Sequence, residues 1–337
     1  MSRWASNPEA AADALIGRAL EAIDLSGRIL LANQGGALPT RLAERGVAPV
    51  LWNRRADTIG QAQPWPPAGP FDAALLRLAK ARDERDMAAH ACLGALAPGG
   101  QLVLWGGNDE GIRSAAGALA RLCGSVDTLA VGGHGRVLAT PRHAGPLPLR
   151  ASLEAWRTVA ELQIGASTRP WVSYPGIFAA GRIDEGTGLL LGVLPQLKAG
   201  ARVLDYGCGS GVIGATLLAS EATLRLDLMD NDTVALEAAR ENVPAARTVL
   251  GTGLADLAGA TYGAILSNPP LHRGIAEDHA LLNELIAGAP SRLAPGGLLQ
   301  IVVQRRIALE RLLARHFATV TVAAETGRFR VWRAFRG

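Results

Sequence analysis

Residues 203–211 combine an acid with a glycine-rich turn. They read Val-Leu-Asp-Tyr-Gly-Cys-Gly-Ser-Gly, so that a short apolar strand ends at Asp205 and a helix begins at Gly211. Glycines allow the backbone to turn sharply and to approach a ligand closely, and the N-terminal amides of a helix attract an anion. The residues that we expect to bind this ligand are Asp205, Gly207, Cys208, Gly209 and Gly211.

The chemistry of this turn favours S-adenosylmethionine (SAM) as the ligand. The anion of SAM is its methionine carboxylate, which suits the helix amides, while Asp205 supplies negative charge near the ammonium and sulfonium groups. Asp230 ends the next predicted strand, where it is placed to accept hydrogen bonds from ribose hydroxyls, with Asn231 beside it. One alternative is a dinucleotide, because residues 209–214 also read GxGxxG, although Asp205 would repel its pyrophosphate. The other alternative is a turn that binds nothing.

The sequence Asn268-Pro269-Pro270 follows a further predicted strand and could hold an amine. An exocyclic amine on a base is a poor nucleophile, because its lone pair is delocalised into the ring. Pro269 pushes Asn268 into an extended conformation, and two successive prolines stiffen the turn so that nearby carbonyls can project into a site. We expect the Asn268 side-chain carbonyl and the Pro269 backbone carbonyl to accept the two amine hydrogens and to aim the lone pair at the methyl group. Asn268 is also expected to contact SAM. This chemistry requires no metal, and the alternative is a simple Asn-Pro turn.

Side chains near these two motifs are candidates for contact with the substrate, namely Phe178, Leu271, His272 and Arg273. A loop histidine is often merely solvated, and Phe178 could instead be a hydrophobic staple. Both interpretations stay open from the residues alone.

Alternating strands and helices surround the motifs. Strands are predicted at 201–205, 224–229, 246–250, 262–267, 297–303, 318–323 and 329–335. Helices are predicted at 187–197 with Thr187 as cap, and at 211–220, 232–242, 277–293 and 306–315. This alternation predicts an α/β fold with a mainly parallel sheet, helices on both faces and ligands at the carboxyl ends of the strands. The last two strands are predicted to form an antiparallel hairpin at one edge.

The N-terminal half carries a second, weaker copy of the same pattern. Residues 71–76 resemble 262–266, and residues 96–104 resemble 293–301, with similar spacing in both halves. We infer a duplicated α/β unit.

The two copies differ where chemistry would be located. The first copy has Asn-Gln-Gly-Gly at 33–36 after its first strand, and Arg-Leu-Ala-Lys at 77–80 where the second has Asn-Pro-Pro. We therefore expect a degenerate domain at 1–145 that binds no cofactor and a catalytic domain at 146–337. A connecting helix is predicted around 151–163.

The composition limits the class of protein. The chain has 337 residues, of which 49% are hydrophobic and 19% charged, as in a compact soluble protein of two domains. The formal charge is +4, and all but two of the 34 basic residues are arginine, which permits nucleic-acid binding without demonstrating it. The three cysteines are widely spaced and no apolar run is long enough to cross a membrane, so a reducing, cytoplasmic location is expected.

Segments around both motifs resemble the ribosomal RNA guanine-N2 methyltransferases of the RsmC type, which are class I SAM-dependent enzymes of the small methyltransferase domain superfamily. The segments are Tyr-Pro-Gly-Ile-Phe at 174–178, the glycine turn at 203–212, Ser-Asn-Pro-Pro-Leu-His-Arg-Gly at 267–274 and Thr-Gly-Arg-Phe-Arg-Val-Trp-Arg-Ala at 326–334. The resemblance implies two tandem Rossmann-like class I methyltransferase domains. Each would have a mainly parallel, seven-stranded sheet, helices on both faces and an antiparallel edge strand.

The resemblance also implies roles for individual residues. Asp205, Gly207, Gly209 and Asp230 would bind SAM, and Asn268, Pro269 and Pro270 would hold the target amine. The chain departs from the family pattern at Leu271, where an aromatic residue able to stack on the base is common. It departs again at 251–253, Gly-Thr-Gly, where many relatives place an acid or amide near the adenine.

The expected function is transfer of a methyl group from SAM to the N2 amine of a guanine in ribosomal RNA, most simply 16S RNA, with the base swung out of its stack. The N-terminal copy would position the RNA through arginines, and the chain is expected to be a monomer. The alternatives are methylation of a protein glutamine amide through the same Asn-Pro-Pro, another RNA substrate such as large-subunit ribosomal RNA or transfer RNA, or a non-catalytic SAM-fold binding module.

Overall fold

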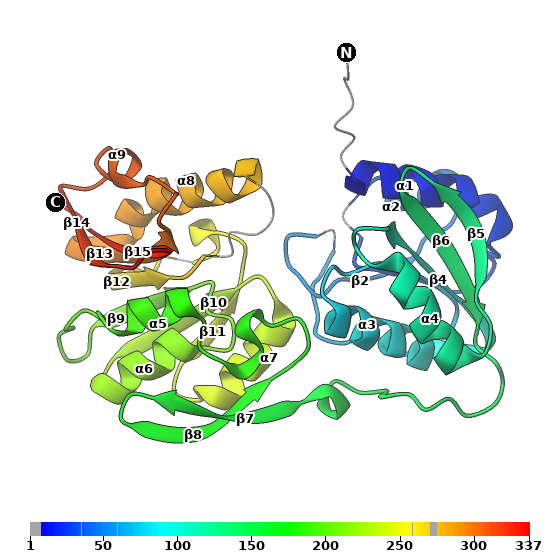
Figure 1. Cartoon of the computed structure of the whole chain (residues 1–337), viewed down its shortest axis with the longest axis horizontal. Helices are drawn as coiled ribbons and strands as arrows, with labels where there is room; N and C mark the ends of the chain where they lie inside the picture. The colour runs from blue at the N-terminus through cyan, green and yellow to red at the C-terminus, as the bar shows by residue number, and fades with distance from the viewer. Residues whose placement is uncertain (1–7, 35, 59, 258, 270–274) are drawn as a thin grey trace, which may run out of the picture. The chain divides into compact units, whose positions relative to one another are not determined.

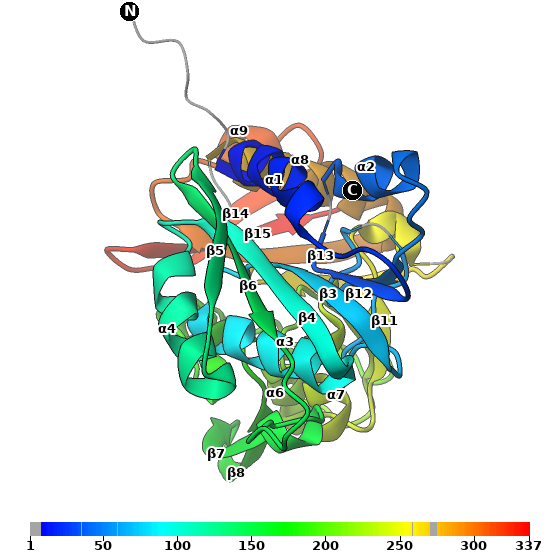
Figure 2. The same ribbon diagram turned by 90° about the vertical axis from the view of Figure 1, so that its right-hand side faces the viewer.

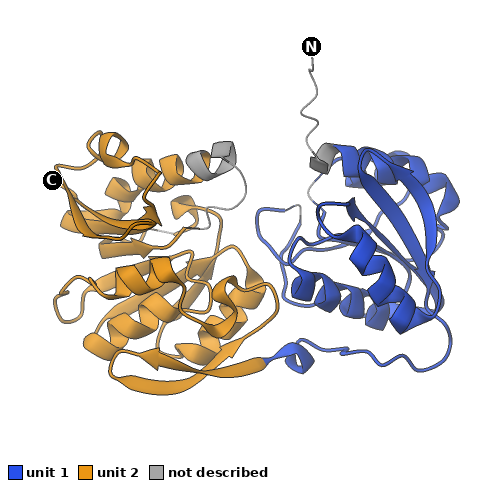
Figure 3. Cartoon of the chain, viewed as in Figure 1, with its two compact units in different colours: residues 1–157 blue, residues 158–337 orange. Residues whose placement is uncertain are grey.

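A computed structural model describes residues 8–34, 36–58, 60–257, 259–269 and 275–337. The chain divides into two compact units, Met1–Arg157 and Thr158–Gly337, which are called unit 1 and unit 2 (Figure 3). Each unit has its own sheet and its own apolar cores.

Unit 1 is a sheet of six strands in the order β2-β1-β3-β4-β6-β5 (Figures 1 and 2). The first four strands in that order pair in parallel, and β6 and β5 complete the edge as antiparallel strands. Helices α1 and α2 pack on one face and α3 and α4 on the other. The elements are α1 Pro8–Ala19, β1 Ile29–Ala32, α2 Leu38–Glu44, β2 Val50–Trp52, β3 Phe71–Arg77, α3 Arg82–Ala95, β4 Leu96–Gly107, α4 Ile112–Cys123, β5 Asp127–Gly132 and β6 Gly135–Pro141.

Unit 2 has a seven-stranded sheet in the order β11-β10-β9-β12-β13-β15-β14, with β15 and β14 antiparallel (Figure 1). Helices α5, α6 and α7 cover one face, and α8 and α9 cover the other. Strands β9, β10 and β12 are almost wholly buried, because a mainly parallel sheet is covered on both faces. The elements are α5 Glu185–Leu191, β9 Arg202–Tyr206, α6 Val212–Ser220, β10 Arg225–Asp230, α7 Thr233–Asn242, β11 Arg247–Leu250, β12 Tyr262–Ser267, α8 Ile275–Arg292, β13 Leu293–Gln304, α9 Glu310–Leu313, β14 Thr319–Glu325 and β15 Phe329–Phe335.

The two sheets share the same strand order, except that unit 1 has no counterpart of β11 among its described residues. The pairing of β3 with β4 in unit 1, and that of β12 with β13 in unit 2, shifts register directly after a buried aromatic residue, Phe71 or Tyr262. Strands β4 and β13 each contain a Pro-Gly-Gly turn whose first glycine has a positive φ, +88° at Gly99 and +71° at Gly296. The predicted tandem α/β architecture is confirmed.

Unit 1 lacks the seventh strand that was predicted for both sheets, as far as its described residues extend. The segment after β2 contains Pro64, Pro66, Pro67 and Pro70, and it contributes one isolated bridge, Asn53 to Ala62. Proline cannot donate to a strand ladder. A strand equivalent to β11 is therefore not formed in this proline-rich stretch.

Two local predictions were wrong. Residues 151–163 form a short 3₁₀ turn, Glu154–Trp156, and the first strand of a hairpin, β7 Thr158–Ile164 with β8 Ser167–Ser173, rather than a helix. Towards the hairpin turn β7 alternates, with Leu162 and Ile164 buried and their neighbours exposed, which is the period of a strand. The helix predicted at 187–197 is the shorter α5, and its N-cap is Asp184 rather than Thr187.

No described helix is long and apolar enough to cross a membrane. Within the described ranges, no group of three or more His, Cys, Asp or Glu side chains is arranged to hold a metal ion.

Candidate active site

The glycine turn after β9 is tied to the end of β10. The backbone N–H groups of Gly207 and Cys208 both donate to the carbonyl of Met229, at 2.8 and 2.9 Å. Gly207, Gly209 and Gly211 all have positive φ, at 71°, 53° and 90°. A Cβ added at Gly209 would meet nothing within 4 Å, so the turn borders open space at that point. Such a turn leaves room for a ligand against the backbone.

Other glycines of this region serve packing. A Cβ on Gly214 would lie 2.6 Å from Leu228 and 2.7 Å from Leu226, and one on Gly211 would lie 3.0 Å from Val243. Gly214 therefore lets α6 pack closely on the sheet, which explains why the segment also reads as a dinucleotide fingerprint.

Asp205 is a fully buried carboxyl at the carboxyl end of β9. Its Oδ2 accepts a 3.0 Å hydrogen bond from the Gly214 N–H, whereas its Oδ1 has no hydrogen-bond partner among the described residues. Burial, more than the nearby charge of Asp230, raises the pKa of Asp205 to about 7, against the opposing effect of the Gly214 hydrogen bond. A buried acceptor without a partner costs free energy, which a cationic ligand group would offset.

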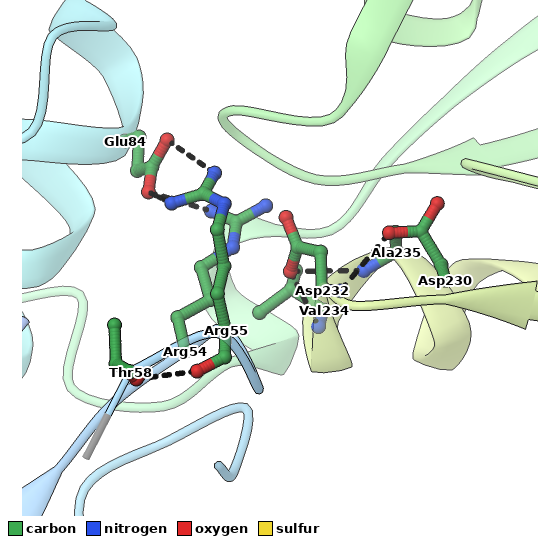
Figure 4. A network of polar contacts seen from close by, with 8 residues as sticks. All are labelled: Arg54, Arg55, Thr58, Glu84, Asp230, Asp232, Val234 and Ala235. Carbon is green, nitrogen blue, oxygen red and sulfur yellow. Dashed lines mark hydrogen bonds and ion pairs between the residues drawn. The ribbon is translucent and has the colours of Figure 1, made fainter. Parts of the chain in front are cut away.

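Asp230 joins the end of β10 to the glycine turn. Its Oδ2 accepts from the Gly209 N–H at 2.8 Å and its Oδ1 accepts from the Asp232 N–H at 3.0 Å. Asp232 in turn caps α7 by accepting from the amides of Val234 and Ala235, as the close-up in Figure 4 shows. The partly buried Asn231 lies between these two acids. The glycine turn therefore holds Asp230, the acid that is predicted to bind the ribose, in place.

Cys208 lies within the turn, and burial raises the pKa of its thiol well above the usual range. The thiol is therefore protonated at neutral pH, and its environment is that of a small apolar side chain rather than a reactive nucleophile.

The register of β12 on β9 brings the second motif beside the first. Ser267 is the partner of Tyr206, and its hydroxyl donates to the Tyr206 carbonyl at 2.8 Å. Asn268 and Gly207 each follow directly on that pair, because the two strands run in parallel. Parallel strands therefore place both motifs at one edge of the sheet.

The Asn268 side chain is anchored by residues far away in the sequence. Its Nδ2 donates to Thr187 Oγ1 at 2.9 Å and to Asp184 Oδ1 at 3.3 Å. The next residue, Pro269, is buried. The predicted contacts at Pro270, Leu271, His272 and Arg273 lie outside the described residues.

The β7–β8 hairpin is fixed to the glycine turn by side chains that the motifs alone did not reveal. The Trp171 indole N–H donates to Ser210 Oγ at 3.0 Å. Asn242 accepts from the Val172 N–H at 2.8 Å and donates to the carbonyls of Val172 and Ser210. An apolar–polar hairpin pattern could have revealed this strand, whereas its partners could not be read from spacing.

Phe178 follows this hairpin and is exposed by 50%. The next two residues, Ala179 and Ala180, have φ values of 61° and 45°, in the left-handed region that residues with a Cβ rarely adopt. A large, exposed ring on a strained turn is unlike a hydrophobic staple, which packs its side chain away from water.

The strand ends of unit 1 carry different groups. Arg77, at the end of β3, makes a bidentate ion pair with Glu110, with both N–O distances at 2.8 Å. After β2, Arg55 pairs with Glu84 at 2.6 Å and Arg54 lies 3.8 Å from the same carboxylate, which is visible in Figure 4. Glu110 neutralises Arg77 within the unit, whereas Arg54 and Arg55 share the single carboxylate of Glu84.

Comparison with known families and structures agrees with the geometry. Residues 169–333 match the family described as Methyltransferase small domain, and residues 29–140 match Methyltransferase small domain N-terminal. Unit 2 thus contains the whole of the first match and unit 1 the whole of the second.

Several proteins named Ribosomal RNA small subunit methyltransferase C are similar to this chain. That of Hahella chejuensis (strain KCTC 2396) is 32% identical over 328 residues, covering 93% of this chain and 95% of the relative. That of Stutzerimonas stutzeri (strain A1501) is 35% identical over 283 residues, covering 81% of each. The fold is shared with the T. thermophilus 16S rRNA N2 G1207 methyltransferase (RsmC), solved with AdoMet and guanosine, at a TM-score of 0.82 and 22% identity over 99% of this chain and 93% of that one. The chain therefore belongs to the ribosomal RNA small subunit methyltransferase C family.

Proposed function

We propose that the chain transfers a methyl group from SAM to the exocyclic N2 amine of a guanine in 16S ribosomal RNA. The observation that carries this proposal is the pairing of Ser267 with Tyr206, which places Asn268 beside the glycine turn in unit 2. Membership of the family supports the substrate class, and the T. thermophilus relative was solved with both AdoMet and guanosine.

The residues at the end of the sheet fit SAM. Asp205 Oδ1 is a buried acceptor that can receive the ammonium group, and the open space at Gly209 admits a ligand against the backbone. Asp230 and Asn231 would face the ribose, and Gly207, Cys208 and Gly211 would shape the turn. When bound, SAM supplies an electrophilic methyl group on its sulfonium. The chain supplies the binding site.

Asn268 and Pro269 would act on the target amine. The Asn268 side-chain oxygen and the Pro269 carbonyl would each accept one N–H of the guanine N2, while Pro270 stiffens the turn. Hydrogen bonds from both amine hydrogens to these fixed acceptors would aim the nitrogen lone pair at the methyl group. They would also stabilise the positive charge that develops on the nitrogen during transfer. Orientation and electrostatics would therefore supply most of the catalysis.

The base must leave its stack to reach this site. We propose that the exposed ring of Phe178 stacks on it, and that Leu271, His272 and Arg273 line the same site.

The catalytic domain would comprise residues 146–337, and the domain 1–145 would bind no cofactor and would position the RNA backbone. The three cysteines are free and buried, which fits action in the cytoplasm. All proposed catalytic groups lie in one unit, which fits a monomer.

The test is to incubate the purified chain with labelled SAM and, separately, small ribosomal subunits, naked 16S RNA, transfer RNA and peptide release factors. We expect label in 16S RNA alone, free or within the subunit. Label on transfer RNA would reassign the RNA substrate. Label on protein alone would contradict the proposal and favour a glutamine-amide methyltransferase.

A further inference from the structure

The orientation of the Asn268 amide is fixed by the chemistry of its partners. The carboxylate of Asp184 only accepts hydrogen bonds, so the group that faces it at 3.3 Å must be the NH2 and not the carbonyl oxygen. Thr187 Oγ1 accepts the second N–H at 2.9 Å. Both amide hydrogens are thereby used, and the Asn268 oxygen lies on the opposite side of the planar amide.

The anchor itself is rigid. Asp184 caps α5 by accepting from the Gly186 and Thr187 N–H groups at 3.0 and 3.1 Å. A Cβ on Gly186 would lie 3.1 Å from the Phe329 ring, so the first turn of α5 packs tightly on the start of β15. Thr187 is 8% exposed. A buried hydroxyl on a packed helix holds its direction better than one on a loop.

We propose that Asp184 and Thr187 are positioning residues, which hold the amide of Asn268 so that its oxygen faces the target amine. This inference rests on the proposed function. An asparagine without such partners can turn its amide over, since the two orientations differ little in shape. In the flipped orientation the Asn268 NH2 would face the target NH2. Two donors would then oppose each other, and the target amine would have no acceptor on Asn268. The anchor therefore acts on the chemical step and not on binding of SAM.

Thr187→Val tests this role, because valine keeps the shape of threonine and removes the acceptor. We expect kcat for methylation of small subunits to fall about tenfold, with the Kd for SAM and the KM for subunits within about twofold. Thr187→Ser keeps the hydroxyl and should restore kcat to within about threefold of the parent. The matched control is Thr216→Val, which removes a buried helix hydroxyl that donates only to the Val212 carbonyl, and kcat should be unchanged.

The double variant Thr187→Val, Asn268→Ala separates positioning from a general structural effect. If Thr187 acts only through Asn268, the double variant should be no slower than Asn268→Ala alone. An unchanged kcat in Thr187→Val, or equal losses in the Val and Ser variants together with weaker SAM binding, would overturn the positioning role. Full activity in Asn268→Ala would refute the proposed role of Asn268, and the positioning role with it. Failure of the parent chain to label 16S RNA would instead refute the proposed function.

Discussion

Equivalent strand ends in the two units carry opposite chemistry. In unit 1, β3 ends in Arg77, whose guanidinium forms a bidentate ion pair with Glu110. In unit 2, β12 is followed by Asn268, a neutral amide whose hydrogens are used by Asp184 and Thr187 and whose oxygen is directed elsewhere. One strand end is closed by an internal ion pair, and the other keeps an oriented acceptor.

The first strands of the two sheets differ in the same sense. After β1, the Gln34 N–H donates to Asn53 Oδ1 at 2.9 Å and the Gln34 amide donates to Asp13 Oδ2 at 3.3 Å. Side chains of unit 1 therefore occupy the place beyond the strand. After β9, glycines take that place and Asp205 retains a buried oxygen that none of the described residues satisfies.

This topology does not by itself create a site. Both sheets contain a Pro-Gly-Gly turn and end with an antiparallel pair of strands. Alternating glycines follow β9 in unit 2, whereas they do not follow its counterpart β1 in unit 1. The function depends on groups placed at the sheet edge.

The largest effect is expected at Asn268. Asn268→Ala removes the oriented acceptor and should lower kcat by about 10²–10³-fold, with the Kd for SAM within a few-fold. Single-turnover methylation and calorimetric titration with SAM measure the two quantities. Undiminished turnover would exclude the proposed role.

Arg77→Met should damage stability and not the site. The substitution keeps the alkyl stem but leaves Glu110 buried without its partner, which should cost about 3 kcal/mol of unfolding free energy. Hydrogen bonds from Arg77 and from the Gly107 N–H keep the pKa of Glu110 below its usual value, although burial alone would raise it. Denaturant unfolding should report the loss while the Kd for SAM stays constant.

The double variant Arg77→Met, Glu110→Gln is the control for that interpretation. It removes the unpaired charge and should recover most of the lost stability. A fall in SAM affinity in either variant would contradict a purely structural role for this ion pair.

Gly209→Ala should weaken SAM binding about tenfold, because the added methyl enters the open space of the turn at a φ of 53°. Gly296→Ala is the matched control, since its φ is 71° and its Cβ also meets nothing within 4 Å. Both variants carry a similar backbone strain. Equal SAM affinities in the two would contradict a ligand at Gly209.

Asp205→Asn should raise the free energy of unfolding and weaken SAM binding. The pKa of Asp205 is raised from 3.8 to about 7 in the folded chain. Its contribution to stability is therefore fully present below pH 3.8 and is lost as the pH rises through about 7, because the folded state holds a proton that the unfolded chain releases. The variant should abolish this decline and gain about 1 kcal/mol near pH 8 in the absence of SAM.

The same variant should bind SAM more weakly, because the ammonium loses its charged partner. Urea unfolding between pH 4 and pH 8, with and without SAM, measures both effects. A pH profile identical to that of the parent chain would show that Asp205 is ionised throughout the range.

Much of this contrast could be predicted from the sequence. The continuous apolar runs before Asp205 and Asn268 indicated buried parallel strands, and their order predicted a shared sheet edge. The duplicated Pro-Gly-Gly turns predicted the two sheets. These signals are local, so spacing is sufficient to find them.

What could not be predicted depends on distant partners. Asp184 and Thr187 lie 84 and 81 positions from Asn268, and no local pattern links them. A connecting helix was predicted around 151–163, but pairing with β8 across the turn at Gly165 makes residues 158–164 a strand. Unit 1 likewise has six strands and not seven because prolines occupy the stretch after β2. Their effect on strand pairing could be recognised only once the position of a strand equivalent to β11 was known.

In the proposed mechanism, Asn268 presents the N2 amine of a guanine in 16S RNA to SAM. The most direct test is to digest 16S RNA methylated by the purified chain to nucleosides and to identify the product by mass spectrometry. We expect N2-methylguanosine as the one new modified nucleoside, absent with Asn268→Ala. A methyl group on another atom or another base, or N2-methylguanosine formed equally by the variant, would contradict the account.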